Sequence, residues 1–208
     1  IQHVSALGGS DYPTTLNNGK LMAWGNYTIT ERIFANGGTL SANGTGINTF
    51  TSAGHVTLGG NLTVQTETSS TNTLELAGIM DGSGGFTRNG GGTVYVTNNA
   101  NTYSGPTIVN SGSRLWVGKT VGGTGILGTG VTTNNGTLFA NSPVLTSGAV
   151  VNNNSGLLVL APPTLTVGRL VNQSGTVYGT SVVQTVNGAQ RMVRSEERRV
   201  GKECRSRW

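Results

Sequence analysis

The sequence is poor in charge and in the residues that favour helices. Only 10% of its 208 residues are charged, whereas a soluble domain carries about 25%, and strong helix formers such as Glu, Lys and Arg are scarce. Proline occurs only 5 times, and no apolar run approaches the ~18 residues of a membrane-spanning helix. These absences argue against a helical protein and against charge-driven disorder, and they exclude a helical membrane span.

Much of the charge that is present lies in one short tail. Residues 194–208 hold six basic and three acidic residues, and without them the net charge falls from +5 to +2. The tail resembles the conceptual translation of a common short-read sequencing adapter, so we interpret it as an assembly artefact and not as native sequence. Its basic residues therefore do not indicate a nucleic-acid partner, and we expect none.

Cysteine is absent outside the tail, because the only cysteine is Cys204. A chain otherwise free of cysteine is typical of an exported bacterial protein. The first residue is Ile1 and no signal peptide follows it, so we expect an internal segment of a longer protein.

Short alternating runs that follow a small turn residue recur along the chain. They begin at positions 38, 54, 72, 92, 112, 136, 156 and 175, a spacing of about 20 residues that is typical of a solenoid repeat. In a run such as Gly92-Thr-Val-Tyr-Val96, the two valines share one face of a strand and the residue between them points away. This period predicts an all-β fold, a β-solenoid with one coil per repeat. We assign it to residues 1–193, with the clearest repeats in 34–180.

A single coil is too small to fold alone, since ordering ~20 residues costs roughly 30 kcal/mol. Stacking coils every ~4.8 Å satisfies the backbone hydrogen bonds and builds a continuous interior. Gly and Asn suit the corners, because both tolerate left-handed backbone angles and Asn side chains form ladders. An antiparallel sandwich and a barrel are the alternatives, but the regular period favours the solenoid. Residues 1–33 are less regular, and we expect an irregular coil there.

Residues 84–118 resemble the autotransporter-associated β-strand repeat. That family has a Gly-Gly-Leu-Thr-Lys opening, a Gly-Thr-Leu-x-Leu strand and an Asn-Thr-Tyr-Ser-Gly segment. This chain has Gly84-Gly-Phe-Thr-Arg88, Gly92-Thr-Val-Tyr-Val96 and Asn101-Thr-Tyr-Ser-Gly105 at these places. The resemblance implies a right-handed parallel β-helix and the passenger of a type V secretion protein, or a related bacterial surface protein. It also implies a secreted, outer membrane-associated location, and a translocator barrel or anchor outside this segment.

Several motifs of nucleotide and metal sites are approached but not completed. Gly123-Thr-Gly-Ile-Leu-Gly128 matches a dinucleotide fingerprint, but no helix is expected after it. The segment Gly112–Thr120 has one residue too many for a P-loop. Asp81 lacks the neighbouring carboxylates of a calcium loop, and His3 and His55 have no ligand cluster around them. We therefore expect no cofactor and no metal.

A β-helical polysaccharidase needs a pair of carboxylates. The acidic residues before the tail are Asp11, Glu31, Glu67, Glu75 and Asp81. Glu67 and Glu75 are placed to approach each other across neighbouring coils, although surface charge is the favoured interpretation. Nucleophilic catalysis lacks a cysteine and a Ser–His–acid set. We predict no catalytic residues and no enzyme activity; the alternative is a carbohydrate-binding or carbohydrate-cleaving β-helix of the tailspike or lyase type.

The middle residue of each run is expected to point outward. In order these residues are Ser41, Thr57, Glu75, Tyr95, Trp116, Phe139, Val159 and Tyr178. If the coils stack in register, the four aromatic side chains of Tyr95, Trp116, Phe139 and Tyr178 form an exterior column that Val159 interrupts. The turn before Trp116 is one residue longer, so its alternation can be offset by one. Packing between coils is the favoured role of this column, and a docking stripe for surface glycans or for proteins of a host or neighbouring cell is the second.

The predicted function follows from these features taken together. Stiffness that comes from hydrogen bonds between coils suits a structural stalk that presents an adhesive tip or contributes an adhesive flank. Such a protein acts through its length and its surface and needs no active site.

Overall fold

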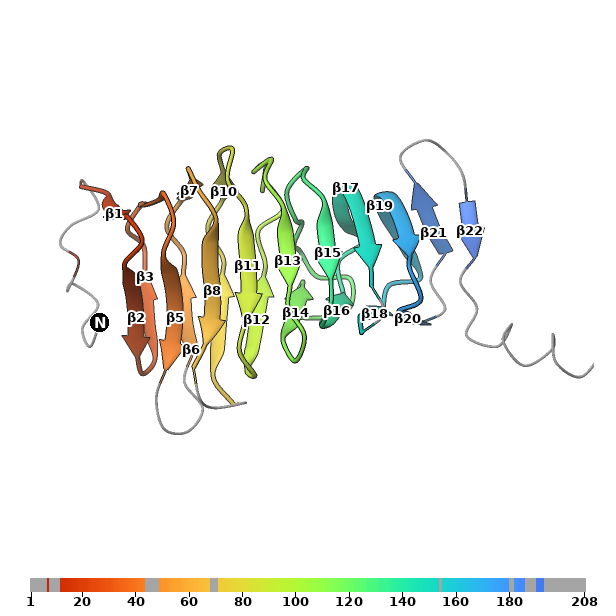
Figure 1. Ribbon diagram of the computed structural model, residues 1–208, viewed down its shortest axis with the longest axis horizontal. Helices are drawn as coiled ribbons and strands as arrows, with labels where there is room; N and C mark the ends of the chain where they lie inside the picture. Colours follow the sequence, from red (N-terminus) through yellow and green to blue (C-terminus); the bar gives the residue numbers. More distant parts are fainter. Residues whose placement is uncertain are drawn as a thin grey trace, which may run out of the picture.

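The chain folds as an elongated stack of β-strand coils (Figure 1). The computed structural model describes residues 7, 12–43, 49–67, 71–153, 155–179, 182–185 and 190–192. Over these residues the backbone forms strands, bends and turns and no helix. The described part of the chain accordingly has no helix that is long and apolar enough to cross a membrane.

The strands form three sheets, which run along the long axis of the molecule (Figure 1). Sheet A contains β1 (Thr14–Leu16), β4 (Ile33–Ala35), β7 (Val56–Leu58) and β10 (Met80–Asp81). Sheet B contains β2 (Lys20–Trp24), β5 (Thr39–Asn43), β8 (Leu62–Thr66), β11 (Phe86–Asn89), β13 (Thr107–Val109), β15 (Thr132–Asn134), β17 (Val144–Asn152), β19 (Thr164–Asn172), β21 (Val182–Thr185) and β22 (Gln190–Met192). Sheet C contains β3 (Tyr27–Ile29), β6 (Thr49–Ser52), β9 (Thr73–Leu76), β12 (Thr93–Val96), β14 (Arg114–Val117), β16 (Thr137–Ala140), β18 (Leu157–Leu160) and β20 (Thr176–Gly179).

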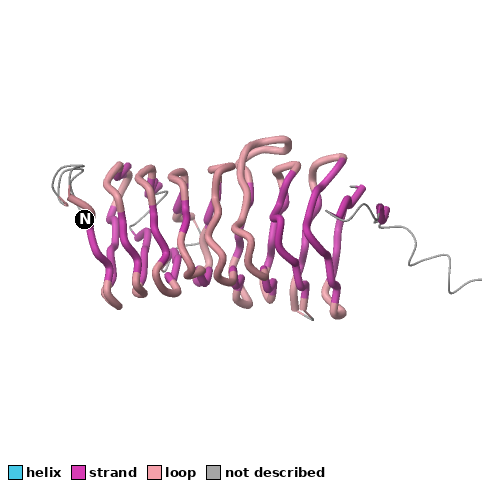
Figure 2. The backbone as a smooth tube through the Cα atoms, turned by 90° about the horizontal axis from the view of Figure 1, so that it is seen from above, coloured by secondary structure: helices cyan, strands magenta, loops and turns pink. Residues whose placement is uncertain are grey.

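Neighbouring strands within each sheet are parallel, except for the antiparallel pair β21 and β22. Along sheet C, each strand pairs with the equivalent strand of the next coil. The fold is therefore a parallel β-solenoid with about 21 residues per turn. The prediction of an all-β solenoid, with the period read from the spacing of the runs, is confirmed. Figure 2 shows the coils from above, stacked along one axis.

The predicted outward column is wrong at its first two members. Ser41 lies on β5 in sheet B and Thr57 on β7 in sheet A, whereas Glu75 lies on β9 in sheet C. A coil contains up to three short runs of similar sequence, and alternation does not tell which side of the coil a run occupies. On sheet C, the residues in register before Glu75 are instead Thr28 and Thr51.

The start of the chain is more regular than predicted. From Thr14 onward the first coil already contains β1, β2 and β3, and these pair with β4, β5 and β6 of the next coil. The expectation of an irregular coil in residues 1–33 is therefore wrong for the residues after 13.

Aliphatic side chains fill the interior of the solenoid. In sheet C they form two columns, Leu74, Val94, Leu115, Leu138 and Leu158, and Leu76, Val96, Val117, Ala140 and Leu160, all of them buried. The residues between them on the same strands are only half-buried. This alternation is what a pleated strand imposes when one of its faces packs on a core.

Sheet A ends at β10, and irregular backbone takes over this corner of the coil. The segment between β12 and β13 places Tyr103 in the interior, where its ring packs edge-on against Phe86 with 5.8 Å between the centroids. The hydroxyl group of Tyr103 lies 2.7 Å from Oγ1 of Thr107. Because Tyr103 is fully buried, desolvation raises its pKa to about 12.

Glycines stack on one another where the chain enters sheet B, at the turn before the strand in the earlier coils and within β17 and β19 in the later ones. The set is Gly60, Gly84, Gly105, Gly130, Gly148 and Gly168, one in each successive coil. A Cβ atom at Gly84 would lie 2.0 Å from the carbonyl oxygen of Gly60, and a Cβ atom at Gly130 would lie 2.1 Å from that of Gly105. Only glycine allows the backbones of adjacent coils to approach so closely at this turn, which accounts for part of the high glycine content.

One inward-facing column at the corner between sheets B and C is polar. Arg88 is fully buried, and its guanidinium group donates to the carbonyl oxygens of Gly92 and Arg114, at 2.5 and 2.9 Å. Burial lowers the pKa of Arg88 to about 9. Three asparagines in later coils follow Arg88 and Val109 in the same column: Asn134, Asn152 and Asn172.

These three residues form an interior asparagine ladder. The side-chain nitrogen of Asn134 donates to Oδ1 of Asn152 at 2.8 Å, and that of Asn152 donates to Oδ1 of Asn172 at 3.0 Å. Asn134 and Asn152 are buried, whereas Asn172 is the exposed end of the ladder. The prediction that asparagine side chains form ladders between coils is confirmed here. The ladder also satisfies carbonyl oxygens of the turns that lead into sheet C, such as those of Gly156 and Leu157.

Candidate functional site

The predicted aromatic column lies on the outer face of sheet C. The backbone register aligns Tyr95 with Trp116, Trp116 with Phe139, Phe139 with Val159, and Val159 with Tyr178. Trp116 is in line with its neighbours, so the longer turn before it does not offset its alternation. The structure thus brings three of the four predicted residues together, and Val159 separates the fourth from them.

The rings in this column pack on one another along the axis of the solenoid. The Trp116 and Phe139 rings are stacked, with 3.6 Å between centroids and 7° between planes. The Tyr95 and Trp116 rings are tilted by 47°, with centroids 6.0 Å apart. Because Trp116 and Phe139 are stacked, each ring covers one face of the other, whereas a sugar needs an open face of an aromatic ring to stack on. The geometry favours packing between coils as the role of this part of the column.

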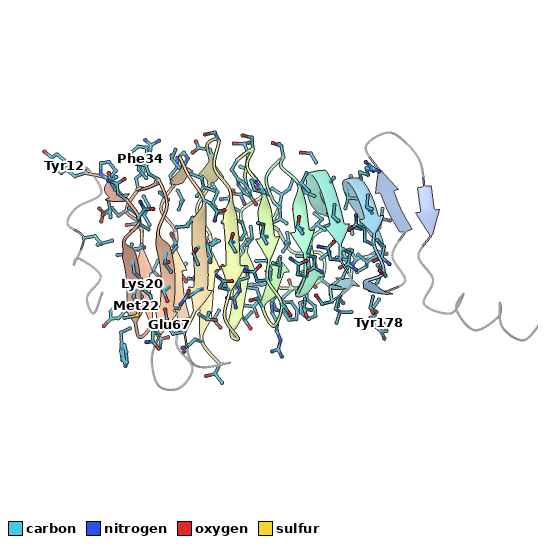
Figure 3. The ribbon with its side chains drawn as sticks, viewed as in Figure 1. Tyr12, Lys20, Met22, Phe34, Glu67 and Tyr178 are labelled. Atoms are coloured by element: carbon cyan, nitrogen blue, oxygen red, sulfur yellow. The ribbon has the colours of Figure 1, made fainter. Side chains whose placement is uncertain are left out.

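Tyr178 differs from the other three aromatic residues. It is 62% exposed and extends from β20, which is the strand at the C-terminal edge of sheet C (Figure 3). Its neighbour in register is Val159 and not another ring. Tyr178 is therefore the one member of the predicted stripe whose ring is largely open to solvent.

A charged pair lies at the opposite end of the column. Glu75 precedes Tyr95 in register, and its carboxylate accepts from Nζ of Lys119 and, at 2.9 Å, from Oγ1 of Thr97. The Lys119 ammonium group also lies 5.8 Å from the centroid of the Tyr95 ring, within the range of a cation–π contact. The carboxylate of Glu75 is thus paired with an ammonium group, and the two contacts hold it in place.

Glu67 is engaged in a separate network after strand β8. Its carboxylate accepts from Lys20 and Ser41, each at 2.5 Å, and from Gln65 at 2.8 Å. The Lys20 and Glu67 side chains lie close together in Figure 3. Burial alone would raise the pKa of Glu67, but the hydrogen bonds from these three residues outweigh it, and the pKa is lowered.

The two glutamates therefore have different partners. Glu67 is paired with Lys20 at sheet B, and Glu75 is paired with Lys119 at sheet C. A general acid for glycoside cleavage needs a carboxyl group with a raised pKa, whereas the pKa of Glu67 is shifted in the opposite direction.

The remaining titratable residues singled out in the sequence form no larger cluster within the described residues. Nε2 of His55 lies 2.9 Å from Oδ2 of Asp81 at sheet A. His3, Asp11 and Cys204 lie outside the described residues. Among the residues that the structure describes, no group of three or more His, Cys, Asp or Glu side chains is placed to hold a metal ion.

The two glycine-rich motifs adopt conformations unlike those of nucleotide sites. Strand β14 passes through the P-loop-like segment Gly112–Thr120, and the fingerprint-like segment Gly123–Gly128 is irregular backbone with no helix after it in the described chain. The second segment borders a cavity of about 410 Å³, together with Asn99 and Pro143. None of the described residues that line this cavity is basic, so its walls do not favour a phosphate group.

Sequence reasoning missed a regular set of carboxamides at the C-terminal ends of the strands of sheet B, on the outer side of the coil. Residues at equivalent positions of six successive coils are Gln65, Asn89, Asn110, Asn135, Asn153 and Gln173, which we call the amide column. Asn135, Asn153 and Gln173 border a cavity of about 460 Å³, together with Ser155. The signal was present in the sequence as a carboxamide two positions after Thr, Ile or Val in each coil. The predicted corner position of asparagines agrees with the structure here, because Asn110, Asn135 and Asn153 each directly follow a strand of sheet B.

Comparison of the chain with family models, with curated proteins and with solved structures finds no match. The observed parallel β-solenoid agrees with the fold that the resemblance of residues 84–118 implies.

Proposed function

We propose that this chain is a rigid structural segment, a stalk, of a secreted or surface-exposed bacterial protein. The observation that carries the proposal is the uninterrupted register of sheet C, in which eight strands from successive coils pair in parallel. In sheets B and C each coil is hydrogen-bonded to the next, so bending the stack requires many backbone hydrogen bonds to deform together.

Three further features of the coils support a stiff segment. The stacked glycines let adjacent backbones approach closely at one corner, and the interior asparagine ladder links coils at another. On the outside, the stacked Trp116 and Phe139 rings join two more coils. All three sets of contacts run along the axis, which is the direction in which a stalk bears load.

A location at the bacterial surface is supported by the sequence. Residues 84–118 resemble the autotransporter-associated β-strand repeat, and residues 1–193 contain no cysteine, as is typical of exported bacterial proteins. On this proposal the chain is part of a type V passenger or a related surface protein. A translocator barrel or anchor is then supplied by sequence outside this segment.

Distance measurements between spin labels test the rigidity. Labels are placed at Thr28→Cys and Tyr178→Cys in a chain that also carries Cys204→Ser. These positions are seven strand steps apart in sheet C, so the distance between their backbones is about 34 Å at a spacing of about 4.8 Å. A single narrow distribution near this value is expected, and it should broaden in urea. A broad distribution without urea would contradict a rigid stalk.

A display experiment tests the location. The chain is placed between an export signal and an outer-membrane anchor, with an epitope at its N-terminus, and the cells are probed with an antibody. Exposure of the epitope and resistance of the segment to external protease are expected. Retention of the segment inside the cell, or its rapid proteolysis at the surface, would contradict the proposal.

The carbohydrate alternative divides into two parts. For cleavage, the described carboxylates of Glu67 and Glu75 are each neutralised by a lysine, so this pair does not favour it. For binding, the amide column is a specific observation in favour.

A further inference from the structure

The outer face of sheet B carries two parallel columns of uncharged side chains. The first is the amide column. The second lies two residues earlier along the chain in each coil, within the strands, and consists of Thr63, Thr87, Ile108, Thr133, Val151 and Val171; we call it the β-branched column. Because the strands are parallel and in register, the two columns repeat once per coil, at about 4.8 Å along the axis of the solenoid.

Four of the six carboxamides are held in fixed orientations by hydrogen bonds within two pairs. The side-chain nitrogen of Asn110 donates to Oδ1 of Asn89, and that of Asn153 donates to Oδ1 of Asn135, both at 2.6 Å. A carboxamide offers two N–H groups and two lone pairs, and each of these ladder bonds uses one N–H group of one side chain and one lone pair of the other. Donors and acceptors therefore remain available for a ligand from positions that are already ordered.

An open surface hollow lies beside the amide column in the later coils. The cavity of about 460 Å³ is bordered by Asn135, Asn153, Ser155 and Gln173. These four residues are half-buried or exposed, and none of them carries a charge. The neighbouring Val151 and Val171 add apolar surface to the side of the same strip.

We propose that this face of sheet B, from Asn89 to Gln173, binds a neutral polysaccharide chain that lies along the axis of the solenoid. A hydroxyl group both donates and accepts a hydrogen bond, and a carboxamide is a neutral side chain that complements both roles. The sugar units of an extended polysaccharide repeat at a length close to the spacing of the coils, so successive sugars meet equivalent amides. The β-branched column then contacts the C–H surfaces of the sugars.

The charges of this face determine which class of polysaccharide fits. Lys20 and Glu67 lie at the N-terminal coils and are paired with each other, and neither column contains an ionisable side chain between Asn89 and Gln173. The exposed Arg169, two residues before Val171 on β19, is a cation that borders the β-branched column. An acidic polysaccharide would meet Arg169 beside the last coils and no basic residue within the columns, so most of its carboxylates would lose hydration on this face without gaining a salt bridge, whereas a neutral polysaccharide carries no such charge. A binding activity of this kind adds to the structural role proposed above and does not depend on it.

The test uses the whole chain in pull-down assays with insoluble neutral polysaccharides (cellulose, a β-1,3-glucan and chitin) and, as acidic polymers, polygalacturonate and hyaluronan. The main variant is Asn153→Leu combined with Gln173→Leu, which removes two adjacent amides and leaves the backbone hydrogen bonds in place. Two control variants change other faces: Asn99→Leu makes the same substitution in the turn after β12, and Tyr178→Ala removes the exposed ring of sheet C. Far-UV circular dichroism checks that every variant is folded.

We expect binding to at least one neutral polysaccharide, little dependence of this binding on salt, and a roughly tenfold weaker affinity in the double variant, as one or two lost hydrogen bonds produce. Both controls should bind like the unchanged chain. The proposal is overturned if no neutral polysaccharide binds, if only the acidic polymers bind, or if the double variant binds normally. Loss of binding in Tyr178→Ala alone would assign the site to sheet C and would also overturn it. The spin-label distances are unaffected by any of these results, so the stalk is judged separately.

Discussion

A single methyl group is enough to interfere with the stacking of the coils at the turn into sheet B. At Gly130 the added Cβ would lie 2.1 Å from the carbonyl oxygen of Gly105. We expect Gly130→Ala to lower the free energy of unfolding by about 2 to 3 kcal/mol, because the backbone of one coil must shift away from the other. Urea denaturation followed by circular dichroism measures this loss.

Gly91 provides the matched control, since nothing lies within 4 Å of the position that a Cβ atom would take there and its φ is not left-handed. Gly91→Ala should leave stability unchanged or raise it by about 0.5 kcal/mol, because alanine restricts the unfolded chain more than glycine does. If both variants lost the same amount of stability, the close stacking of glycines would not be the reason why position 130 requires glycine.

The buried phenol of Tyr103 makes stability depend on alkaline pH. Its pKa is about 12 in the folded chain against 10.0 for the ordinary side chain, so its contribution is fully present below pH 10 and is lost as the pH rises through 12. This pKa difference corresponds to about 3 kcal/mol of folding free energy. We expect Tyr103→Phe to cost about 1 kcal/mol at pH 7, where the hydrogen bond with Thr107 is lost, and to show a flatter decline of stability between pH 10 and 12.

Urea titrations of both proteins at pH 7, 10 and 11.5 measure this difference. If the two proteins lose stability in parallel above pH 10, ionisation of Tyr103 is not responsible for the decline.

At the scale of elements, the interior asparagine ladder joins sheet B to the turns before sheet C. Asn152 is its central member: it accepts from Asn134, donates to Asn172, and also donates to the carbonyl oxygen of Thr176 at 3.1 Å. Each of these hydrogen bonds is buried or partly buried. The ladder can therefore stabilise the chain only when the coils on both sides of Asn152 are folded and in register.

Removing the central amide should disturb three coils at once. We expect Asn152→Asp to destabilise the chain by about 3 kcal/mol or more, since it buries a carboxylate and removes the donors to Asn172 and Thr176. Asn99→Asp makes the same change at an exposed position and should stay within about 0.5 kcal/mol of the unchanged chain. The midpoints of urea unfolding measure both, and similar midpoints for the two variants would contradict a stabilising role for the ladder.

At the scale of the whole molecule, a solenoid should tolerate the loss of one complete coil. Val94 pairs with Leu115 in adjacent strands of sheet C, so deleting positions 94–114 removes one coil and joins Thr93 to Leu115 at an equivalent position. The remaining coils keep their register, because each coil contacts only its neighbours. We expect a folded chain with an unchanged circular dichroism signal per residue and a cooperative unfolding transition.

Deleting positions 94–103 is the matched control, since it removes about half a coil. It places later strands on the wrong side of the stack and should abolish cooperative unfolding. A chain that unfolds after both deletions would contradict the independence of the coils, and one that folds after both would contradict the register.

Much of the coil could be predicted from the sequence because alternation is a local property of a strand. The valines of Gly92-Thr-Val-Tyr-Val96 face inward and Tyr95 faces outward, as expected. The placement of Ser41 and Thr57 could not be predicted in this way, since which side of a coil a run occupies depends on the bends between runs. The ion pairs of the two glutamates could not be predicted either. Glu67 and Glu75 each pair with a lysine, and each of these lysines comes from a different coil than its glutamate.

The amide column illustrates the same limit for the candidate site. Asn135 and Asn153 come from successive coils, and the local pattern of a carboxamide two positions after a β-branched residue does not by itself show that the two side chains are neighbours. Their relation becomes visible only when the register of β15 and β17 is known.

Composition and period by themselves determined that this chain is all β and that it winds with a coil of about 20 residues, because alternation and turn residues act over a few neighbouring positions. Which side chains form columns depends on the folded arrangement of the coils: stacked aromatic rings lie on sheet C, amides along sheet B and asparagines in the interior. The physical reason is that a column is built by the register between coils, and register is set by hydrogen bonds between residues that are distant in the chain.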